Sequence, residues 1–421
     1  MVRILKKIVI EGKKELSGTI KIGGAKNSVV ALIPATILSK GVSIIKNVPD
    51  ISDVHILMEM MEYLGCKVKY INESLTIDTT NLEYKEIPEK YSQKLRASYY
   101  FMGSLLGRFK KAAISNPGGC VIGSRPINFH LEAFKRMGAN IKEDAGSYKM
   151  ETKGLKGTTY FFDFPSVGAT INVMIAAVLA KGKTKIVNAA REPEIANVAS
   201  YLISMGAKIY GAGSSTIEII GVDELHEGRV DVIPDRIEAG TYLIIGALLG
   251  KKLVIDGVIE DHLESLLFKL KDAGVKYTVK NNSITINKAN KLNAINIKTT
   301  VYPGFPTDLG QPMSTFLTQC NGESLFEETI YENRLRHIPH LNNMGADIKA
   351  FDKTAIVRGP SKLVGRKVKA TDLRAGASML VAGMIAEGTT TIYNIEHLLR
   401  GYEKLVDKLN NVGANISLID E

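Results

Sequence analysis

The 421-residue sequence contains no tryptophan, only three cysteines and only 13 prolines. Three cysteines leave one unpaired in any disulfide scheme, and their wide separation matches neither a disulfide framework nor a metal-binding pattern. With 45% hydrophobic and 23% charged residues, the composition excludes a disordered or collagen-like chain. A globular protein with ordinary apolar cores is expected, and its length suggests two or three domains.

Long hydrophobic runs are also missing. The most apolar stretches, such as residues 242–249, are far shorter than the ~18–20 residues that span a bilayer. Charges interrupt the N-terminal residues before the apolar region of a signal peptide can form. We therefore expect a cytoplasmic protein that does not use a membrane.

The net charge of +10 arises from 54 Lys and Arg against 44 Asp and Glu. Basic residues form only short clusters, at 108–111 and 362–369, and acids are scattered among them. A nucleic-acid-binding protein should instead concentrate its basic residues on one face or arm. The charge favours anionic small molecules as substrates. Neither a nucleic acid nor an obligate protein partner is expected.

A short phrase with a central glycine occurs six times along the chain. These glycines, at 65, 138, 206, 274, 345 and 413, are separated by 73, 68, 68, 71 and 68 residues. Each phrase ends an amphipathic helical stretch and opens a β-rich one, which is typical of a glycine that follows a helix. A second series of glycines ends small-and-apolar helical stretches, at Gly41, Gly107, Gly182, Gly250, Gly322 and Gly388. The two series predict six units, each roughly strand–helix–strand–helix–strand–strand.

Helices at 172–181 and 375–386 are apolar nearly all round, which indicates burial. Helices inside and sheets outside, in two lobes of three units, would explain this pattern. The segment 231–236, after the third unit, is a plausible crossing point between lobes. A cleft between lobes is a common position for a functional site.

Residues 23–28, Gly-Gly-Ala-Lys-Asn-Ser, follow an expected strand and open an apolar helix. Backbone N–H groups at such a helix start, with Lys26 beside them, favour a bound phosphate or carboxylate. The alternative is a glycine turn with a solvated lysine.

The segment 116–126 is rich in glycine and contains Cys120 close to Arg125. A cysteine in such a loop can have a lowered pKa and react. It can equally be a small buried hydrophobe, which is the role expected of Cys66 and Cys320.

Asp308 follows a Pro/Gly turn and precedes an expected helix, so it could be a helix cap or a general base. Arg334, Arg374 and Arg400 each lie near an expected helix start, where a structural ion pair is a sufficient explanation. If they converge with Lys26, Arg96 and Arg125, they form a strongly anion-binding site. The seven histidines show no metal-ligand pattern.

In chain order, ten of these short phrases resemble the enolpyruvyl transferase family. They are residues 24–27, 95–98, 117–120, 122–126, 166–170, 188–194, 306–308, 332–334, 372–375 and 400–403. The Pro-Gly-Gly-Cys loop at 117–120 is the most specific, because it is similar to the branch of the family that uses a UDP-sugar. The resemblance implies an α/β fold of two lobes, the inside-out α/β barrel, built from six βαβαββ-type repeats. One lobe would be residues 24–233, with Cys120, the other residues 1–23 plus 234–421, and the active site would lie in the cleft between them.

The resemblance also implies a reaction. The enolpyruvyl group of phosphoenolpyruvate would pass to the 3-hydroxyl of UDP-N-acetylglucosamine with release of phosphate, the first committed step of peptidoglycan synthesis. Asp308 would accept the hydroxyl proton, and Cys120 would donate a proton to C3 of phosphoenolpyruvate. No metal or organic cofactor is expected.

The resemblance assigns further residues to the two substrates. Five residues would hold phosphoenolpyruvate: Lys26, Asn27, Arg125, Arg374 and Arg400. Of these, Lys26 and Arg400 would also be catalytic. The UDP-sugar would be held by Arg96, Arg125, Pro126, Ile127, Asn128, Phe129, Ser166, Val167, Gly168, Asp308 and Ile330. Supporting roles would fall to Arg334, Asp372 and Glu192.

Four positions depart from the family's usual residues: Asn128 and Phe129 replace Asp-Leu, Leu399 replaces an acid beside Arg400, and Ile171 replaces a Glu. Two alternatives therefore stay open. One is an enolpyruvyl transferase with a different acceptor, and the other is a weakly catalytic protein that binds a UDP-sugar.

Overall fold

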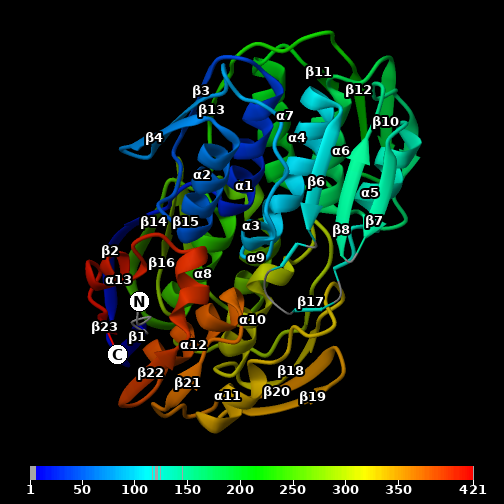
Figure 1. The fold of residues 1–421 in the computed structure, drawn as a ribbon. Coiled ribbons are helices and arrows are strands. Elements are labelled where there is room, and N and C mark those ends of the chain that lie inside the picture. Colours follow the sequence, from blue (N-terminus) through cyan, green and yellow to red (C-terminus); the bar gives the residue numbers. More distant parts are fainter. Residues whose placement is uncertain (1–5, 116, 119–121, 124, 145, 421) are drawn as a thin grey trace. The chain divides into compact units, whose positions relative to one another are not determined.

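The computed structural model describes residues 6–115, 117–118, 122–123, 125–144 and 146–420. These residues divide into two compact units (Figure 1). We call residues 24–118 and 125–233 the middle unit, and residues 6–23 and 234–420, with Ile122 and Gly123, the terminal unit. Each unit has its own apolar core, and both mix helices and sheets.

The described part of the middle unit contains three sheets. In spatial order, their strands are β13 (Arg229–Asp231), β3 (Val42–Lys46), β5 (Ser74–Asp78) and β4 (Lys67–Ile71); β11 (Lys208–Tyr210), β12 (Thr216–Ile220), β10 (Lys183–Val187) and β9 (Thr159–Phe161); and β6 (Lys111–Ser115), β8 (Ser147–Glu151) and β7 (Asn140–Asp144).

The described part of the terminal unit also contains three sheets. Their strands are β21 (Lys367–Lys369), β22 (Thr389–Tyr393), β1 (Lys6–Glu11) and β23 (Asn415–Asp420); β15 (Tyr277–Lys280), β16 (Ser283–Ile286), β14 (Gly250–Asp256) and β2 (Leu16–Lys21); and β17 (Ile297–Lys298), β18 (Gly322–Glu327), β20 (Thr354–Gly359) and β19 (Asp347–Phe351).

The five four-stranded sheets share one pairing pattern. One edge strand is parallel to its neighbour, as β9 is to β10 and β2 is to β14, and the remaining pairs are antiparallel. Buried and exposed positions alternate along strands such as β3 and β22, so each has one face on a core.

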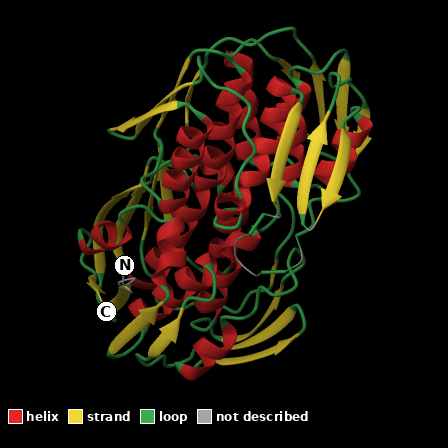
Figure 2. Cartoon of the chain, in the orientation of Figure 1, coloured by secondary structure: helices red, strands yellow, loops and turns green. Residues whose placement is uncertain are grey.

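Most of the long helices lie in the middle of each unit with strands outside them, while some short helices lie at the outer edge (Figure 2). The middle unit has α1 (Lys26–Ala35), α2 (Ser52–Leu64), α3 (Glu89–Ser92), α4 (Tyr100–Phe109), α5 (Asn128–Arg136), α6 (Val167–Ala177) and α7 (Pro193–Ser204). The terminal unit has α8 (Arg236–Leu249), α9 (Glu264–Asp272), α10 (Thr307–Leu317), α11 (Ile338–Asn343), α12 (Leu373–Ile385) and α13 (Leu405–Asn410).

The two helices predicted to be buried are buried. All residues from 169 to 177 in α6 and from 374 to 384 in α12 are buried, as their all-round apolar character indicates. The predicted range 172–181 is wrong at both ends, because α6 begins at Val167 and ends at Ala177. Ser166 determines this start, since its hydroxyl accepts from the N–H of Ala169.

The six phrase glycines all have left-handed backbone conformations, with φ between 92° and 105°. A residue with a side chain is strained there, which explains why glycine recurs at each helix end. The second series is less regular. Gly107 lies inside α4, whose left-handed C-cap is Lys110, and Gly250 begins β14 with φ −70°. The expectation that a helix ends at Gly107 is therefore wrong, whereas α8 does end at Gly250.

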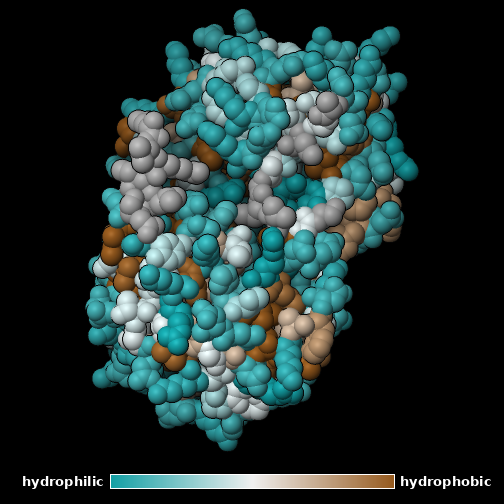
Figure 3. Space-filling view, turned by 60° about the horizontal axis from the view of Figure 1, so that its bottom comes forward, coloured by the Kyte–Doolittle hydropathy of each residue, from teal (hydrophilic) through white to brown (hydrophobic). Residues whose placement is uncertain are grey.

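The face in Figure 3 is mostly hydrophilic, with hydrophobic side chains in separate groups. Within the described residues, no helix is both long and apolar enough to cross a membrane.

Candidate active site

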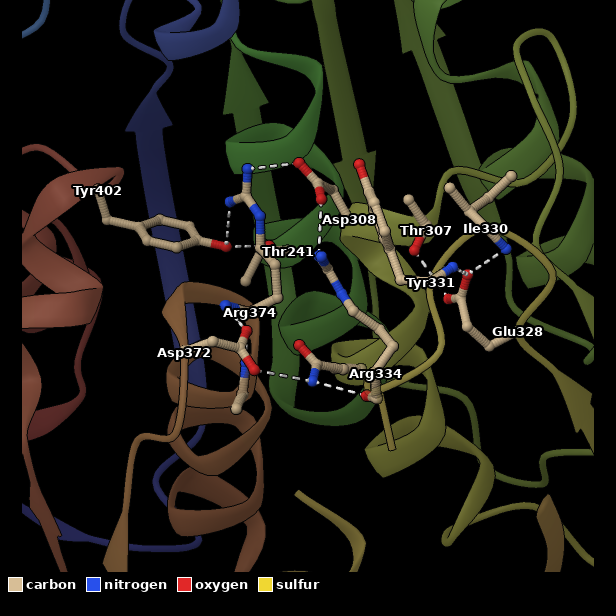
Figure 4. A network of polar contacts seen from close by, with 12 residues as sticks. Thr241, Thr307, Asp308, Glu328, Ile330, Tyr331, Arg334, Asp372, Arg374 and Tyr402 are labelled. Carbon is tan, nitrogen blue, oxygen red and sulfur yellow. Dashed lines mark hydrogen bonds and ion pairs between the residues drawn. The ribbon is translucent and has the colours of Figure 1, made fainter. Parts of the chain in front are cut away.

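An acid and two arginines meet at the start of α10 in the terminal unit (Figure 4). Arg334 donates to Asp308 Oδ1 at 2.7 Å, and Arg374 donates to Asp308 Oδ2 at 2.9 Å. The side chains of Arg334 and Arg374 are 3% and 5% exposed, while that of Asp308 between them is 26% exposed. Pro306 is the N-cap of α10, so the interpretation of Asp308 as a helix cap is wrong.

The electrostatics of this cluster follow from its geometry. Burial by itself would raise the pKa of the Asp308 carboxyl, but the charges and hydrogen bonds of Arg374 and Arg334 outweigh it and hold that pKa well below its usual value. Burial opposes the charge of Arg374, yet Asp308 raises the pKa of that guanidinium above its usual value. Asp308 and Arg374 are therefore both ionised at neutral pH.

Asp372 fixes the position of Arg374. Its carboxylate caps α12 by accepting from the N–H groups of Arg374 at 2.9 Å and Ala375 at 3.1 Å. The guanidinium of Arg374 also reaches the hydroxyl of Tyr402 at 3.4 Å. The side-chain amide of Gln311 donates to Asp372 and to the carbonyl of Arg334, so one buried network holds both arginines.

The structure places Ile330 and Arg400 in the same unit as this cluster. The N–H of Ile330 donates to the carboxylate of Glu328 at 2.8 Å. Arg400 is the last residue of the 3-10 helix η4 (Ile395–Arg400), and the next residue, Gly401, packs against Leu373 at the start of α12. The segment after Leu399 and Arg400 therefore lies beside the helix that carries Arg374.

Lys26, the first residue of α1, forms an ion pair with Asp53 in the first turn of α2. Their Nζ and Oδ2 atoms are 2.8 Å apart, and the side chains are 13% and 1% exposed. Asn27 follows Lys26 and is partly buried. A buried carboxylate against Lys26 restricts where the ammonium group can point, which suits a lysine that must meet an anion.

Replacing Asp53 with Asn should weaken the use of the anionic substrate. A hydrogen bond to a charged group contributes about 1.5–3 kcal/mol, so we expect kcat/KM for the anionic substrate that the resemblance implies to fall by about 10- to 150-fold. Steady-state phosphate release at varied concentrations of that anion measures this change. Asp50→Asn is the matched control, because Asp50 pairs with His55 on the exposed surface. Equal kinetics for the two variants would exclude a role of Asp53 in holding Lys26.

Nine of the eleven residues expected to hold the UDP-sugar belong to the middle unit, whereas Asp308 and Ile330 belong to the terminal unit. Tyr99 is the last residue of the 3-10 helix η2 (Arg96–Tyr99), and its hydroxyl group lies against Gly168. A Cβ atom added to Gly168 would be only 2.6 Å from this hydroxyl oxygen. Its ring also contacts His130 of α5, with ring centroids 4.8 Å apart. Three segments are therefore neighbours in the middle unit: η2, which begins at Arg96, the start of α5 and the start of α6.

Several predicted residues lie at these three places. Arg96 donates to the carbonyl of Pro117 at 3.3 Å, residues 125–127 lead into α5, and Asn128 and Phe129 begin it. Ser166 caps α6, and Val167 and Gly168 begin it. Burial, with the charge of Arg96, lowers the pKa of His130 to about 3, so this ring is neutral at physiological pH.

Three other positions named in the sequence analysis are Cys120, Glu192 and Ile171. Cys120 lies outside the described residues, although Ile122, two residues later, accepts from the N–H of Asn333 at 3.1 Å. Glu192 stands at the cap position of α7. Ile171 is fully buried within α6, which explains how an apolar residue is accommodated there.

Cys66 and Cys320 are buried, at 6% and 0% exposure, and burial raises the pKa of each thiol to about 12. The prediction that they are small buried hydrophobes is confirmed. Two buried acids were not predicted as part of the site: Asp53 beside Lys26 and Glu328 beside Ile330. Asp53 lies in the first turn of a helix and Glu328 follows a strand, and both are common positions for solvent-exposed acids. Only the burial of these two side chains distinguishes them from such acids.

Similarity to known proteins identifies the family of this chain. The family model of EPSP synthase (3-phosphoshikimate 1-carboxyvinyltransferase) matches residues 10–409. UDP-N-acetylglucosamine 1-carboxyvinyltransferase 2 from Listeria monocytogenes is 48% identical over 411 residues, which cover 98% of this chain and 97% of that protein. A protein of the same name from Bacillus cereus is 50% identical over 413 residues, covering 98% and 96%.

Solved structures resemble the same fold. The enolpyruvyl transferase NikO from Streptomyces tendae is 26% identical, with a TM-score of 0.90 over the whole of both chains. An EPSP synthase from Acinetobacter baumannii, 17% identical, has a TM-score of 0.77 over 99% of this chain and all of that one. The chain belongs to the EPSP synthase family of carboxyvinyl transferases. The resemblance to enolpyruvyl transferases is thereby confirmed.

Proposed function

We propose that this protein transfers the enolpyruvyl group of phosphoenolpyruvate to the 3-hydroxyl of UDP-N-acetylglucosamine and releases phosphate. The observation that carries the proposal is the near full-length identity of about one half to relatives named for that activity. The arrangement of Asp308 with two arginines, and of Lys26 with Asp53, suits a reaction of a highly charged anion with a hydroxyl group.

The reaction is an addition followed by an elimination. The 3-hydroxyl oxygen bonds to C2 of phosphoenolpyruvate and loses its proton to Asp308, while C3 gains a proton from Cys120. The C2–O bond to phosphate then breaks as C3 returns a proton to the Cys120 thiolate, which restores the double bond, and the proton held by Asp308 leaves with the phosphate. Donor and acceptor must sit on opposite sides of the reacting carbons, which is why an acid and a base from separate segments are needed.

Asp308 is a poor base while both of its oxygens accept from guanidinium groups. Phosphoenolpyruvate carries its own anionic groups, and it competes for Arg374. Once Arg374 turns to the substrate, one carboxylate oxygen of Asp308 is released beside the acceptor hydroxyl. Substrate binding therefore prepares the base, with Lys26, Asn27, Arg125 and Arg400 as further anion ligands.

The UDP-sugar is assigned to the middle unit's gathered segments and to Ile330. The segments are those of Arg96, residues 125–129 and residues 166–168. We extend the proposal to the fold: six βαβαββ-type repeats, three in each unit, would form the inside-out α/β barrel. The recurrent sheet pattern and the six left-handed glycines support it.

The test is phosphate release from phosphoenolpyruvate by the purified protein, with and without UDP-N-acetylglucosamine. We expect release that requires the sugar nucleotide. No release from folded protein would contradict the proposal. Titration calorimetry with UDP-N-acetylglucosamine then separates two cases: retained binding indicates a weakly catalytic binder, and no binding indicates another acceptor.

A different acceptor is the second candidate, because Asn128 and Phe129 depart from the usual Asp-Leu at the start of α5. Phe129 packs on Phe162, with ring centroids 5.7 Å apart, so its side chain is held near the nucleotide segments. The same phosphate-release assay with other UDP-sugars distinguishes this candidate. Faster release with another sugar would replace the acceptor and keep the reaction.

A further inference from the structure

We propose that Glu328 is a positioning residue for Asp308 and Arg334. Its carboxylate joins the start of α10 to the turn at Ile330 and Tyr331, and so holds the base and its arginine in register. The inference rests on the proposed function, which gives Asp308 its role. Glu328 itself follows β18 and is 1% exposed.

Three hydrogen bonds define the position of this carboxylate (Figure 4). Oε2 accepts from the hydroxyl of Thr307 at 2.7 Å. Oε1 accepts from the backbone N–H groups of Ile330 at 2.8 Å and Tyr331 at 3.2 Å. The backbone of Glu328 is itself anchored, because its N–H donates to the carbonyl of Lys353 at 2.8 Å.

Two short routes lead from Glu328 to the base. Thr307 directly precedes Asp308 at the start of α10, so its hydroxyl bond fixes the first turn of that helix. On the other side, the ring of Tyr331 lies 5.3 Å from the guanidinium carbon of Arg334, a cation–π distance. Arg334 in turn donates to Asp308. Loss of the carboxylate therefore loosens both partners of the ion pair.

The neighbouring acid shows what an ordinary surface role looks like. Glu327 ends β18 and pairs with Lys298 at 3.1 Å, with side chains 38% and 60% exposed. It has the same charge and is adjacent in the sequence, but its carboxylate pairs with the exposed Lys298, whereas that of Glu328 accepts from Thr307, Ile330 and Tyr331. Glu327→Ala is thus a matched control for Glu328→Ala.

The experiment compares kinetics and amide hydrogen exchange in Glu328→Ala, Glu328→Gln, Thr307→Val and Glu327→Ala. A misplacement of about 1 Å near the reacting atoms lowers rates by about 100-fold, so we expect a fall of that size in kcat for Glu328→Ala. Glutamine can still accept from both N–H groups and donate to Thr307, so Glu328→Gln should retain kcat within about fivefold. Thr307→Val should fall between these two.

Glu327→Ala should change kcat by less than about twofold, because it removes only an exposed ion pair. Exchange should accelerate in peptides covering 329–336 for Glu328→Ala and stay unchanged for Glu327→Ala. Equal losses in the Ala and Gln variants of Glu328, or unchanged exchange in Glu328→Ala, would overturn the inference.

The design separates this inference from the proposed function. Wild-type protein without sugar-dependent phosphate release would refute the function. The exchange measurement needs no turnover, so it would still decide whether Glu328 holds the turn. If Glu328→Ala did not fold, Glu328→Gln and Thr307→Val would carry the same comparison.

Discussion

Asp308→Asn should lower kcat by about 1,000-fold while binding of UDP-N-acetylglucosamine stays measurable, since general acid–base groups contribute about 100- to 10,000-fold. The amide keeps the shape of the side chain but cannot accept the hydroxyl proton. It also cannot balance Arg334 and Arg374, which remain buried at 3% and 5% exposure. Phosphate release gives kcat, and titration calorimetry gives the affinity for the sugar nucleotide.

The control is Glu323→Gln, which removes the exposed pair that Glu323 forms with Arg358 at 2.9 Å in the same unit. Exposed pairs contribute little, so this variant should match the wild type in rate and stability. An Asp308→Asn protein with wild-type kcat would remove Asp308 from the proton transfer. Loss of sugar-nucleotide binding together with kcat would instead indicate a wider disruption of the site.

Stability gives an independent view of the same substitution. Removing one partner of a buried pair destabilises by about 3 kcal/mol or more, so Asp308→Asn should unfold at lower denaturant concentration at pH 7. The pKa of Asp308 is lowered in the folded protein, so its stabilisation is present above the usual carboxyl value of about 3.9. It is lost as the pH falls through the folded pKa, and the difference between variant and wild type should shrink below about pH 4.

Much of the fold could be predicted because it depends on local rules that repeat. A glycine in the left-handed conformation after a helix can be read from one phrase, and all six phrase glycines have that conformation. Burial of α6 and α12 followed from apolar residues on every side. Gly107 was misjudged because an interior helix glycine and a terminal one look alike until packing shows that α4 continues to Phe109.

The site was predicted less completely, for a physical reason. Residues such as Arg334 and Arg374 come from separate segments, and their meeting at Asp308 depends on tertiary packing. The family resemblance identified these arginines as candidate site residues, but it did not identify the buried acids Asp53 and Glu328. Asp53 and Glu328 are each only 1% exposed, and the burial of a single acid cannot be predicted from a local sequence pattern.

Replacing Cys120 with Ser should lower kcat by at least about 1,000-fold, because a serine hydroxyl is far too weak an acid to protonate C3 of phosphoenolpyruvate. Cys120→Asp should retain turnover within about tenfold, since a carboxylic acid can donate the proton. Both values come from the phosphate-release assay with the sugar nucleotide present. Near-wild-type activity of Cys120→Ser would remove this thiol from the mechanism.

The other two cysteines provide the control that isolates Cys120. Burial raises the pKa of Cys66 and Cys320 to about 12, so neither forms much thiolate at neutral pH. An epoxide phosphonate such as fosfomycin should therefore add once to the wild type, as the thiolate opens the epoxide and forms a C–S bond. Intact mass should show the same single adduct in Cys66→Ser and none in Cys120→Ser. A wild-type protein without an adduct after long incubation would contradict a reactive thiolate at 120, whereas an adduct that survives in Cys120→Ser would place the reactive thiol elsewhere.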